Sequence, residues 1–310
     1  MILNQNNGSV EDVAQRRLQE LQNFPYTWLQ DTAYQTRGSI SGTLRLSDGR
    51  VAAGAAVFLG DTDTSIRPLV QGSNYYYTTT AEADGSFSFA DVRTGSYGLY
   101  AWSNGGDLAD VYTNVTLTPI RVQANQTTTL GEVDWELPSG RTTIFQLGDF
   151  DKKSLGFKNG GLPYQHGVTD DSPANLTFTI GISNESTDWY YAISALGTWT
   201  IEFDIDASDL AKYGSNGTAL LSLSLASYSQ STALDIDVNG YLLASLTKDE
   251  LASDPALYRS GKTSGEWRFF QYEVAPAQLV AGVNTVGFTV TRYTQWRGFQ
   301  WDSILLEWQS

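Results

Sequence analysis

Alternation of apolar and polar residues runs through most of this chain, and it predicts strands. In Trp199–Asp206 the residues Trp, Ile, Phe and Ile occupy every second position, with polar residues between them. A period of two is typical of a strand with one buried and one exposed face. The same alternation recurs at residues 221–225, 234–238, 286–290 and 299–305. These segments predict an all-β fold in the second half of the chain.

A second group of short strands is expected between residues 37 and 138, where apolar segments alternate with turns such as Asp84-Gly85. The candidates are Ser39–Leu46, Ala55–Leu59, Tyr75–Thr80, Gly85–Phe89, Tyr97–Trp102, Asn114–Pro119 and Thr127–Val133. The run DGSFSFADVRTGSYGLYAW resembles the prealbumin-like and fibronectin-III-like modules of secreted carbohydrate enzymes. Residues 37–138 are therefore expected to form one β-sandwich that acts as a spacer.

Only the N-terminal segment has a helical pattern. Over residues 9–22, Ser9 is a suitable N-cap, and Pro25 follows the pattern and stops it. Its apolar stripe consists of Val10, Val13, Ala14, Leu18 and Leu21. We expect residues 1–36 to form a helical linker that packs against a preceding domain.

The stretch Arg141–Gly160 marks the start of a second sandwich over residues 139–310. Its first half alternates like a strand, and its second half is charged and Gly-rich like a loop. The strands of this half follow one another with no helical pattern between them, except for a possible one at Thr247–Leu257. The second sandwich is therefore expected to be a jelly roll.

The run FQLGDFD follows a Leu-Pro-Ser-Gly turn, and the chain closes with GFQWDSILLEW. These runs resemble the fungal-type rhamnogalacturonan lyases of polysaccharide lyase family 4. The resemblance implies a fibronectin-III-like domain followed by a carbohydrate-binding-like, galactose-binding-like jelly roll. In that jelly roll the last strand lies in the centre of a sheet, beside the N-terminal strand.

In the resembled family the catalytic base and its partner are a lysine and a histidine of a domain that comes first. No position here matches that region, so no catalytic residue is assigned. The resemblance implies the C-terminal half of a rhamnogalacturonan endolyase, which binds or positions pectic rhamnogalacturonan I. Two alternatives remain open: a buttress of the catalytic domain without sugar binding, and a polysaccharide-active enzyme that uses His166.

The net charge and the composition limit the classes of ligand that this chain is expected to bind. The chain of 310 residues has a net charge of −15, which disfavours nucleic acid as a ligand. Binding of a polyuronate is then expected to depend on stacking and hydrogen bonds rather than on the overall field. No run is long enough to span a membrane, and there is no Cys for a disulfide framework. We expect a monomer with no required cofactor.

Six Asn-X-Ser/Thr sequons predict a secreted glycoprotein. They begin at Asn7, Asn114, Asn125, Asn175, Asn184 and Asn216. The first 25 residues contain no apolar run of the signal-peptide type, and this combination is what a C-terminal fragment would show.

Other chemistry is sparse. The single histidine, His166, would need a base or cation beside it, and Lys152, Lys153 and Lys158 lie in the same linking region. No nucleophile elbow or phosphate loop occurs. A structural calcium site is possible from the hard oxygen ligands of three residues. They are Asp149, Asp151 and Asp302.

Aromatic residues give the most specific expectation about sugar binding. The candidates are Trp189, Tyr190, Tyr191, Trp296 and Arg297. The first three are consecutive, so a strand would point at least one of them away from the core. A sugar ring stacked on one exposed Trp would contribute about 2 kcal/mol. The alternative is that these rings fill the sandwich, as expected for Trp199, Trp301 and Trp308.

Overall fold

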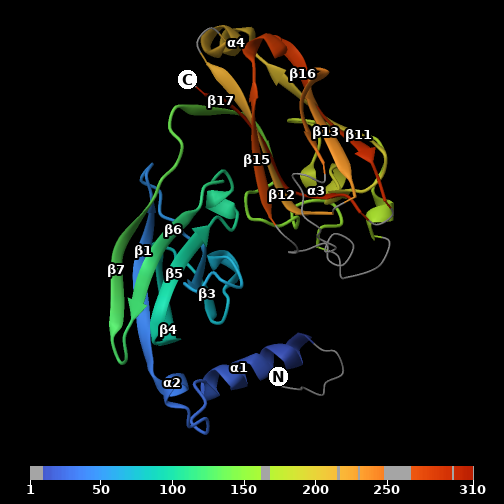
Figure 1. Ribbon diagram of the computed structural model, residues 1–310. Helices are drawn as coiled ribbons and strands as arrows, with labels where there is room; N and C mark the ends of the chain where they lie inside the picture. The colour runs from blue at the N-terminus through green and yellow to red at the C-terminus, as the bar shows by residue number, and fades with distance from the viewer. Residues whose placement is uncertain are drawn as a thin grey trace. The chain divides into compact units, whose positions relative to one another are not determined.

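The computed structural model describes residues 10–161, 168–214, 217–229, 231–247, 267–294 and 297–309. These residues form two compact units, and each is built mainly of β-sheet (Figure 1). The all-β prediction, with a short helix in front, is confirmed. No helix in the described ranges has the length and apolar character needed to cross a membrane.

The first unit comprises Met1–Trp102 and Asn114–Glu136. Its elements are α1 (Val10–Asn23), α2 (Thr32–Gln35), β1 (Arg37–Leu46), β2 (Ala56–Asp61), β3 (Tyr76–Thr80), β4 (Ser86–Arg93), β5 (Gly95–Trp102), β6 (Val115–Val122) and β7 (Thr127–Trp135). Two sheets face each other, with strand orders β4-β1-β7 and β3-β2-β5-β6. All seven predicted strands are present within a few residues of their expected bounds.

Alternation decides which side chains fill the first sandwich. On β1 the core-facing residues Ile40, Leu44 and Leu46 are buried, while Ser41 and Thr43 between them are not. On β2 and β5 the residues Leu59 and Leu99 lie opposite each other, and both are fully buried. The period-2 sequence of β1 therefore gives one dry and one polar face, whereas β2 is buried along four consecutive residues.

Helix α1 differs from the rest of the first unit because none of its residues is buried. Val10, Val13, Leu18 and Leu21 are between 55% and 78% exposed. The segment after it is tied down: the Tyr26 hydroxyl donates to Glu20 at 2.5 Å. A 14-residue helix without a packed face is only marginally stable in water.

The second unit comprises Ser103–Thr113 and Leu137–Ser310. Its strands are β8 (Arg141–Leu147), β9 (Leu176–Thr179), β10 (Ala192–Ile193), β11 (Gly197–Ile205), β12 (Thr218–Tyr228), β13 (Ala233–Val238), β14 (Tyr241–Leu246), β15 (Arg268–Val274), β16 (Gly282–Arg292) and β17 (Phe299–Gln309). Its short helices are α3 (Glu185–Asp188) and α4 (Ala207–Tyr213). One sheet has the order β14-β13-β16-β11-β9, and the other has the order β10-β17-β12-β15 with β8 also on β17.

Strand β17 lies between β12 and the N-terminal strand β8, as the resemblance implied (Figure 1). The core beneath it contains Trp199, Trp301 and Trp308, all at most 2% exposed, which confirms their expected role. The pattern did not predict β14, β15 or α4. Most of the possible helix Thr247–Leu257 lies outside the described residues.

The segment Ser103–Thr113 connects β5 to β6 in sequence but counts with the second unit. Its Ala109 carbonyl accepts hydrogen bonds from the Gln146 side chain at 2.7 Å and from the Phe150 backbone at 3.0 Å. The Tyr112 ring stacks on Phe269 at a centroid distance of 5.3 Å. The expected boundaries at 37–138 and 139–310 do not include this segment, and the last division along the chain falls between Glu136 and Leu137.

Candidate polysaccharide-binding site

The loop that follows β8 is rich in lysine. Residues 149–160, here called the lysine loop, contain Lys152, Lys153 and Lys158, three of the six lysines of the chain. No lysine precedes Lys152 in the sequence. In a chain of net charge −15, this loop is where an anionic ligand meets the highest local density of lysine.

A buried carboxylate anchors the start of this loop to β17. The side chain of Asp302 accepts hydrogen bonds from the backbone N–H groups of Asp151 and Lys153, each at 3.1 Å. Between them Lys152 has φ +64°, a left-handed conformation that costs a non-glycine residue about 1 kcal/mol. Strain of this kind persists only where the surroundings hold it, and it is concentrated at functional sites.

The Lys152 side chain lies on an aromatic face. Its Nζ is 4.3 Å from the ring centroid of Trp267, which immediately precedes β15. The Trp267 indole N–H donates to the Ser224 hydroxyl at 2.8 Å, and that hydroxyl donates to Asp302. The ring, the hydroxyl and the carboxylate therefore form one connected support beneath the ammonium group.

The end of the lysine loop repeats this arrangement on another ring. The Lys158 backbone N–H donates to the Trp189 carbonyl at 2.9 Å, and the Tyr191 N–H donates back to Lys158 at 2.9 Å. This pairing brings the Lys158 Nζ to 4.4 Å from the ring centroid of Tyr190. Both loop ends thus carry a cation on an aromatic face.

Burial adjusts the charges around Lys152. It lowers the pKa of Lys152 to about 7, and the nearby Asp302 carboxylate offsets part of that effect. Burial also raises the pKa of Asp302 to about 8, against the hydrogen bond from Ser224. The pKa of Asp151 is raised for the same reason. As the pH falls through about 7, Lys152 gains its charge, so the loop is most cationic in mildly acidic solution.

The expectation that Trp189 and Tyr191 present rings to a sugar is corrected by their burial, at 0% and 1% exposed. The Trp189 ring lies 5.0 Å from Trp199 and 5.5 Å from Trp301, inside the sandwich. Tyr190, between these two buried neighbours, is half-buried: its ring packs against the same core, with its centroid 6.3 Å from that of Trp199.

Of the remaining predicted residues, only Arg297 lies in the described part of the chain. Trp296 and His166 lie outside the described residues. Arg297 is half-buried and precedes the pairing of Ile193 with Phe299, whereas Tyr190 lies beyond the other end of that pairing. About five residues of strand separate the two positions, or about 17 Å. Arg297 and Tyr190 therefore do not share one surface.

The calcium candidates have other partners. Asp149 accepts a hydrogen bond from the Gly106 N–H at 3.3 Å, and both oxygens of Asp302 accept from donors of the loop and of β12. Within the described ranges, no group of three or more His, Cys, Asp or Glu is placed to hold a metal ion. The calcium site stays a prediction.

The sequence analysis did not single out Trp267. This residue contacts Lys152 although it lies 115 positions further along the chain. A signal was present nonetheless: three lysines within seven residues of an acidic chain. Such a cluster in a loop is a stronger indication of an anion-binding surface than consecutive aromatic residues, which alternate between core and solvent.

Comparison with known families agrees with this architecture. Residues 143–306 match the CBM-like domain III of polysaccharide lyase family 4, and residues 47–130 match its fibronectin-III-like domain II. Two β-sandwiches in this order define a C-terminal module of a polysaccharide lyase. The chain belongs to polysaccharide lyase family 4.

The individual relatives of this chain are all called rhamnogalacturonate lyases. A rhamnogalacturonate lyase of Dickeya dadantii is 29% identical over 92% of this chain, and rhamnogalacturonate lyase A of Aspergillus aculeatus is 26% identical over 84%. A probable rhamnogalacturonate lyase B of Aspergillus niger is 27% identical over 63%. The chain spans 48% of the Dickeya protein and 47% of the A. aculeatus protein. The mixture of sources supports the fungal type only weakly.

Proposed function

We propose that this chain binds rhamnogalacturonan, a pectic polysaccharide, through its second unit and positions it for β-elimination by a catalytic domain outside these residues. The relatives are called rhamnogalacturonate lyases, which indicates the substrate class. The observation that carries the proposal is the pair of ammonium groups on aromatic faces, Lys152 on Trp267 and Lys158 on Tyr190. A uronate offers a carboxylate to these ammonium groups.

The net charge of −15 does not prevent this binding. The attraction of a direct ammonium–carboxylate contact acts at short range, whereas the repulsion from the overall charge of the chain acts at long range. An ammonium–carboxylate contact of about 3 Å is much shorter than the screening length of about 8 Å at physiological salt. Added salt weakens the overall repulsion more than the contact. Affinity should therefore change little between low and physiological ionic strength.

Calorimetric titration with rhamnogalacturonan oligosaccharides tests this binding. Lys158→Met keeps the apolar stem and removes the charge, and it should weaken binding about fivefold, the equivalent of 1 kcal/mol for a partly exposed contact. The matched control is Lys212→Met, because Lys212 also lies over a ring, 4.5 Å from Tyr213, but on α4. Equal affinities for both variants would remove the lysine loop from the proposal.

We propose that the chain alone does not cleave the polysaccharide, since the resemblance places the base and its histidine partner in a domain without a counterpart here. The ultraviolet absorbance of the unsaturated product reports elimination. A signal from purified chain that disappears in His166→Ala would establish the enzyme alternative instead.

We also propose that the protein is secreted and glycosylated. Of the sequon residues in the described ranges, Asn125, Asn175 and Asn184 are exposed. The Asn184 side-chain oxygen caps α3 and the Asn175 oxygen accepts from Thr198, which leaves each amide nitrogen pointing away from these bonds. Expression in a eukaryotic secreting host should give a mass that falls on treatment with an N-glycosidase.

No cofactor is required in this proposal, and the protein is expected to be a monomer. A structural calcium at the positions considered above would reveal itself as a rise in melting temperature on adding Ca²⁺ and a fall on adding a chelator. An unchanged melting temperature would leave the site without calcium.

A buttress without sugar binding is the second candidate, and the exposed apolar stripe of α1 favours it. In that case α1 and both sandwiches would support a catalytic domain. The two candidates separate in the titration above, because a buttress gives no heat with any oligosaccharide.

A further inference from the structure

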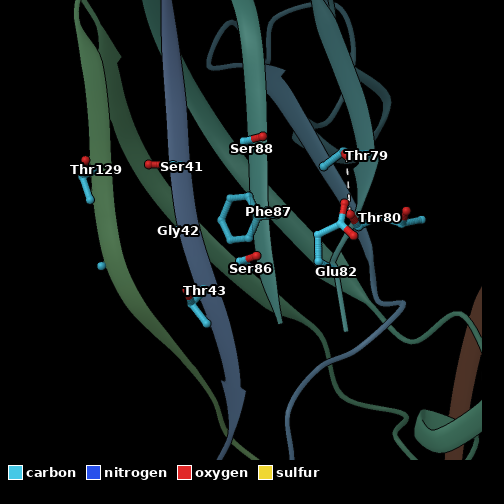
Figure 2. A pocket seen from close by; sticks show the side chains of 11 residues that line it. Ser41, Gly42, Thr43, Thr79, Thr80, Glu82, Ser86, Phe87, Ser88 and Thr129 are labelled. Atoms are coloured by element: carbon cyan, nitrogen blue, oxygen red, sulfur yellow. Dashed lines mark hydrogen bonds between the residues drawn. The ribbon is translucent and has the colours of Figure 1, made fainter. Parts of the chain in front are cut away.

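The first unit has a groove of its own, lined only by residues of that unit. It has a volume of about 390 Å³ and runs over β7, β1 and β4 toward β3 (Figure 2). Seven of its eleven lining residues are serine or threonine. It contains no lysine, arginine or histidine, and Glu82 is its one charged residue.

Strand register arranges these hydroxyl groups in rows. Ser41 on β1 pairs with Thr129 on β7 and with Ser88 on β4, so the three side chains lie side by side on one face (Figure 2). Thr43 pairs with Ser86 in the next row. Cross-strand neighbours on one face are about 5 Å apart, and successive rows about 7 Å apart.

A β-bulge shapes the β7 side of the groove. Ser41 pairs with Thr129 while Thr43 pairs with Glu132, so β7 has an extra residue opposite Gly42. Gly131 in this bulge has φ +71°, and a Cβ added to it would meet nothing within 4 Å. Bulges of this kind re-aim strands and are frequent beside functional sites.

Several of the groove hydroxyls have unused hydrogen-bonding capacity. Across the described part of the chain, the side chains of Ser41, Thr43, Ser88 and Thr129 make no hydrogen bond to another protein group. Hydroxyls elsewhere on the same unit are engaged; Thr128, for example, donates to the Arg121 carbonyl at 2.8 Å. The groove thus offers rows of groups that both donate and accept.

We propose that this groove binds a neutral oligosaccharide. Its volume falls in the range of about 300–1,000 Å³ that is typical of small-molecule sites. Paired donor and acceptor hydroxyls match the hydroxyls of a sugar, the absence of a cation among the lining residues gives a carboxylate no partner, and Glu82 repels one. A peptide that adds a strand would pair along the free edge of β4 or β7, whereas the groove runs across the face of this sheet.

This site does not depend on the lysine loop, and the two differ in the sugars they select. The lysine loop suits acidic residues, whereas the groove suits neutral ones. The domain that the sequence indicated as a spacer would then hold a different part of a branched or mixed glycan.

An NMR titration of the whole ¹⁵N-labelled chain tests the proposal with two probes, one neutral and one acidic. Galactotetraose is neutral, and tetragalacturonate carries a carboxylate on each of the same rings. Galactotetraose should shift the amide resonances of Gly42 and Gly131 with a millimolar dissociation constant. Tetragalacturonate should shift them at least tenfold less at equal concentration and should act on the lysine loop instead.

Two variants locate the binding. Ser41→Phe fills the groove and should abolish the Gly131 shift, while Ser88→Val removes one hydroxyl, keeps a strand-forming residue and should weaken binding about threefold. Lys158→Met is the control and should leave galactotetraose binding unchanged. No shift at about 20 mM galactotetraose, or shifts that persist in both groove variants, would overturn the proposal. A failed groove leaves tetragalacturonate binding by the lysine loop intact, so the two proposals fail separately.

Discussion

Replacement of Tyr112 tests whether Ser103–Thr113 is a structural part of the second unit. The Tyr112 ring stacks on Phe269 with an interplanar angle of 12°, and its centroid is 5.4 Å from that of Phe150. Its hydroxyl contacts the ion pair of Arg141 and Glu307, whose charged atoms are 3.3 Å apart. Burial raises the pKa of Tyr112 to about 12, in keeping with a hydroxyl held away from water.

Two substitutions of Tyr112 separate packing from hydrogen bonding. Tyr112→Ala removes a half-buried ring and should destabilise the second unit by about 2–4 kcal/mol, slightly below the range for fully buried aromatic residues. Tyr112→Phe keeps the ring and removes the hydroxyl, for an expected loss of about 1 kcal/mol. The loss is small because Arg141 and Glu307 remain paired with each other.

Hydrogen exchange followed peptide by peptide measures the two units separately in the full chain. Tyr112→Ala should speed exchange in β12, β15 and β17 and leave β1, β2 and β5 unchanged. Tyr241→Ala is the control, because Tyr241 is 55% exposed on β14 and its removal should change stability by less than about 0.5 kcal/mol. Faster exchange in the first unit alone would show that the segment belongs there.

Three further predictions follow from single side chains. Because burial raises the pKa of Asp302 to about 8, the stability this residue contributes is complete below about pH 4 and is lost as the pH rises through 8. Urea unfolding should therefore show a steeper fall from pH 5 to 9 in the wild type than in Asp302→Asn; parallel profiles would contradict this. The pKa of Lys152 is lowered to about 7, so affinity for tetragalacturonate should fall between pH 6 and 8, and Lys152→Met should remove that dependence. Leu18→Gln on the exposed face of α1 should change the melting of the first unit by less than about 0.5 kcal/mol, and a larger loss would mean that α1 packs on its own sandwich.

The sequence was sufficient for the strands whose two faces meet different environments. Alternation located β1 and β11 because one face of each is dry and the other is not. It was less informative for β12 and β17, where nearly every residue is buried on both faces. There the resemblance placed β17 in the centre of its sheet, which the strand pairing confirms.

The candidate site was harder to predict because it depends on contacts between residues distant in sequence. Alternation indicated that at least one of three consecutive aromatic residues would point away from the core, whereas Trp189 and Tyr191 are buried and Tyr190 is half-buried against Trp199. The approach of Trp267 to Lys152 requires β15 to lie beside β12, and β15 has too weak a period-2 pattern to be found. The sequence of Ser103–Thr113 does not indicate that this segment packs on the second unit, because a surface loop is polar whichever unit it packs against.

The most direct measurement of sugar binding by the lysine loop is the dissociation constant of tetragalacturonate for the wild type and for Lys152→Met/Lys158→Met at pH 5.5. At that pH Lys152 is charged, because its pKa is about 7. Two independent contacts of about 1 kcal/mol each predict binding about 25-fold weaker in the double variant, with unchanged melting. Equal dissociation constants for the two proteins would contradict the assignment of polysaccharide binding to this loop.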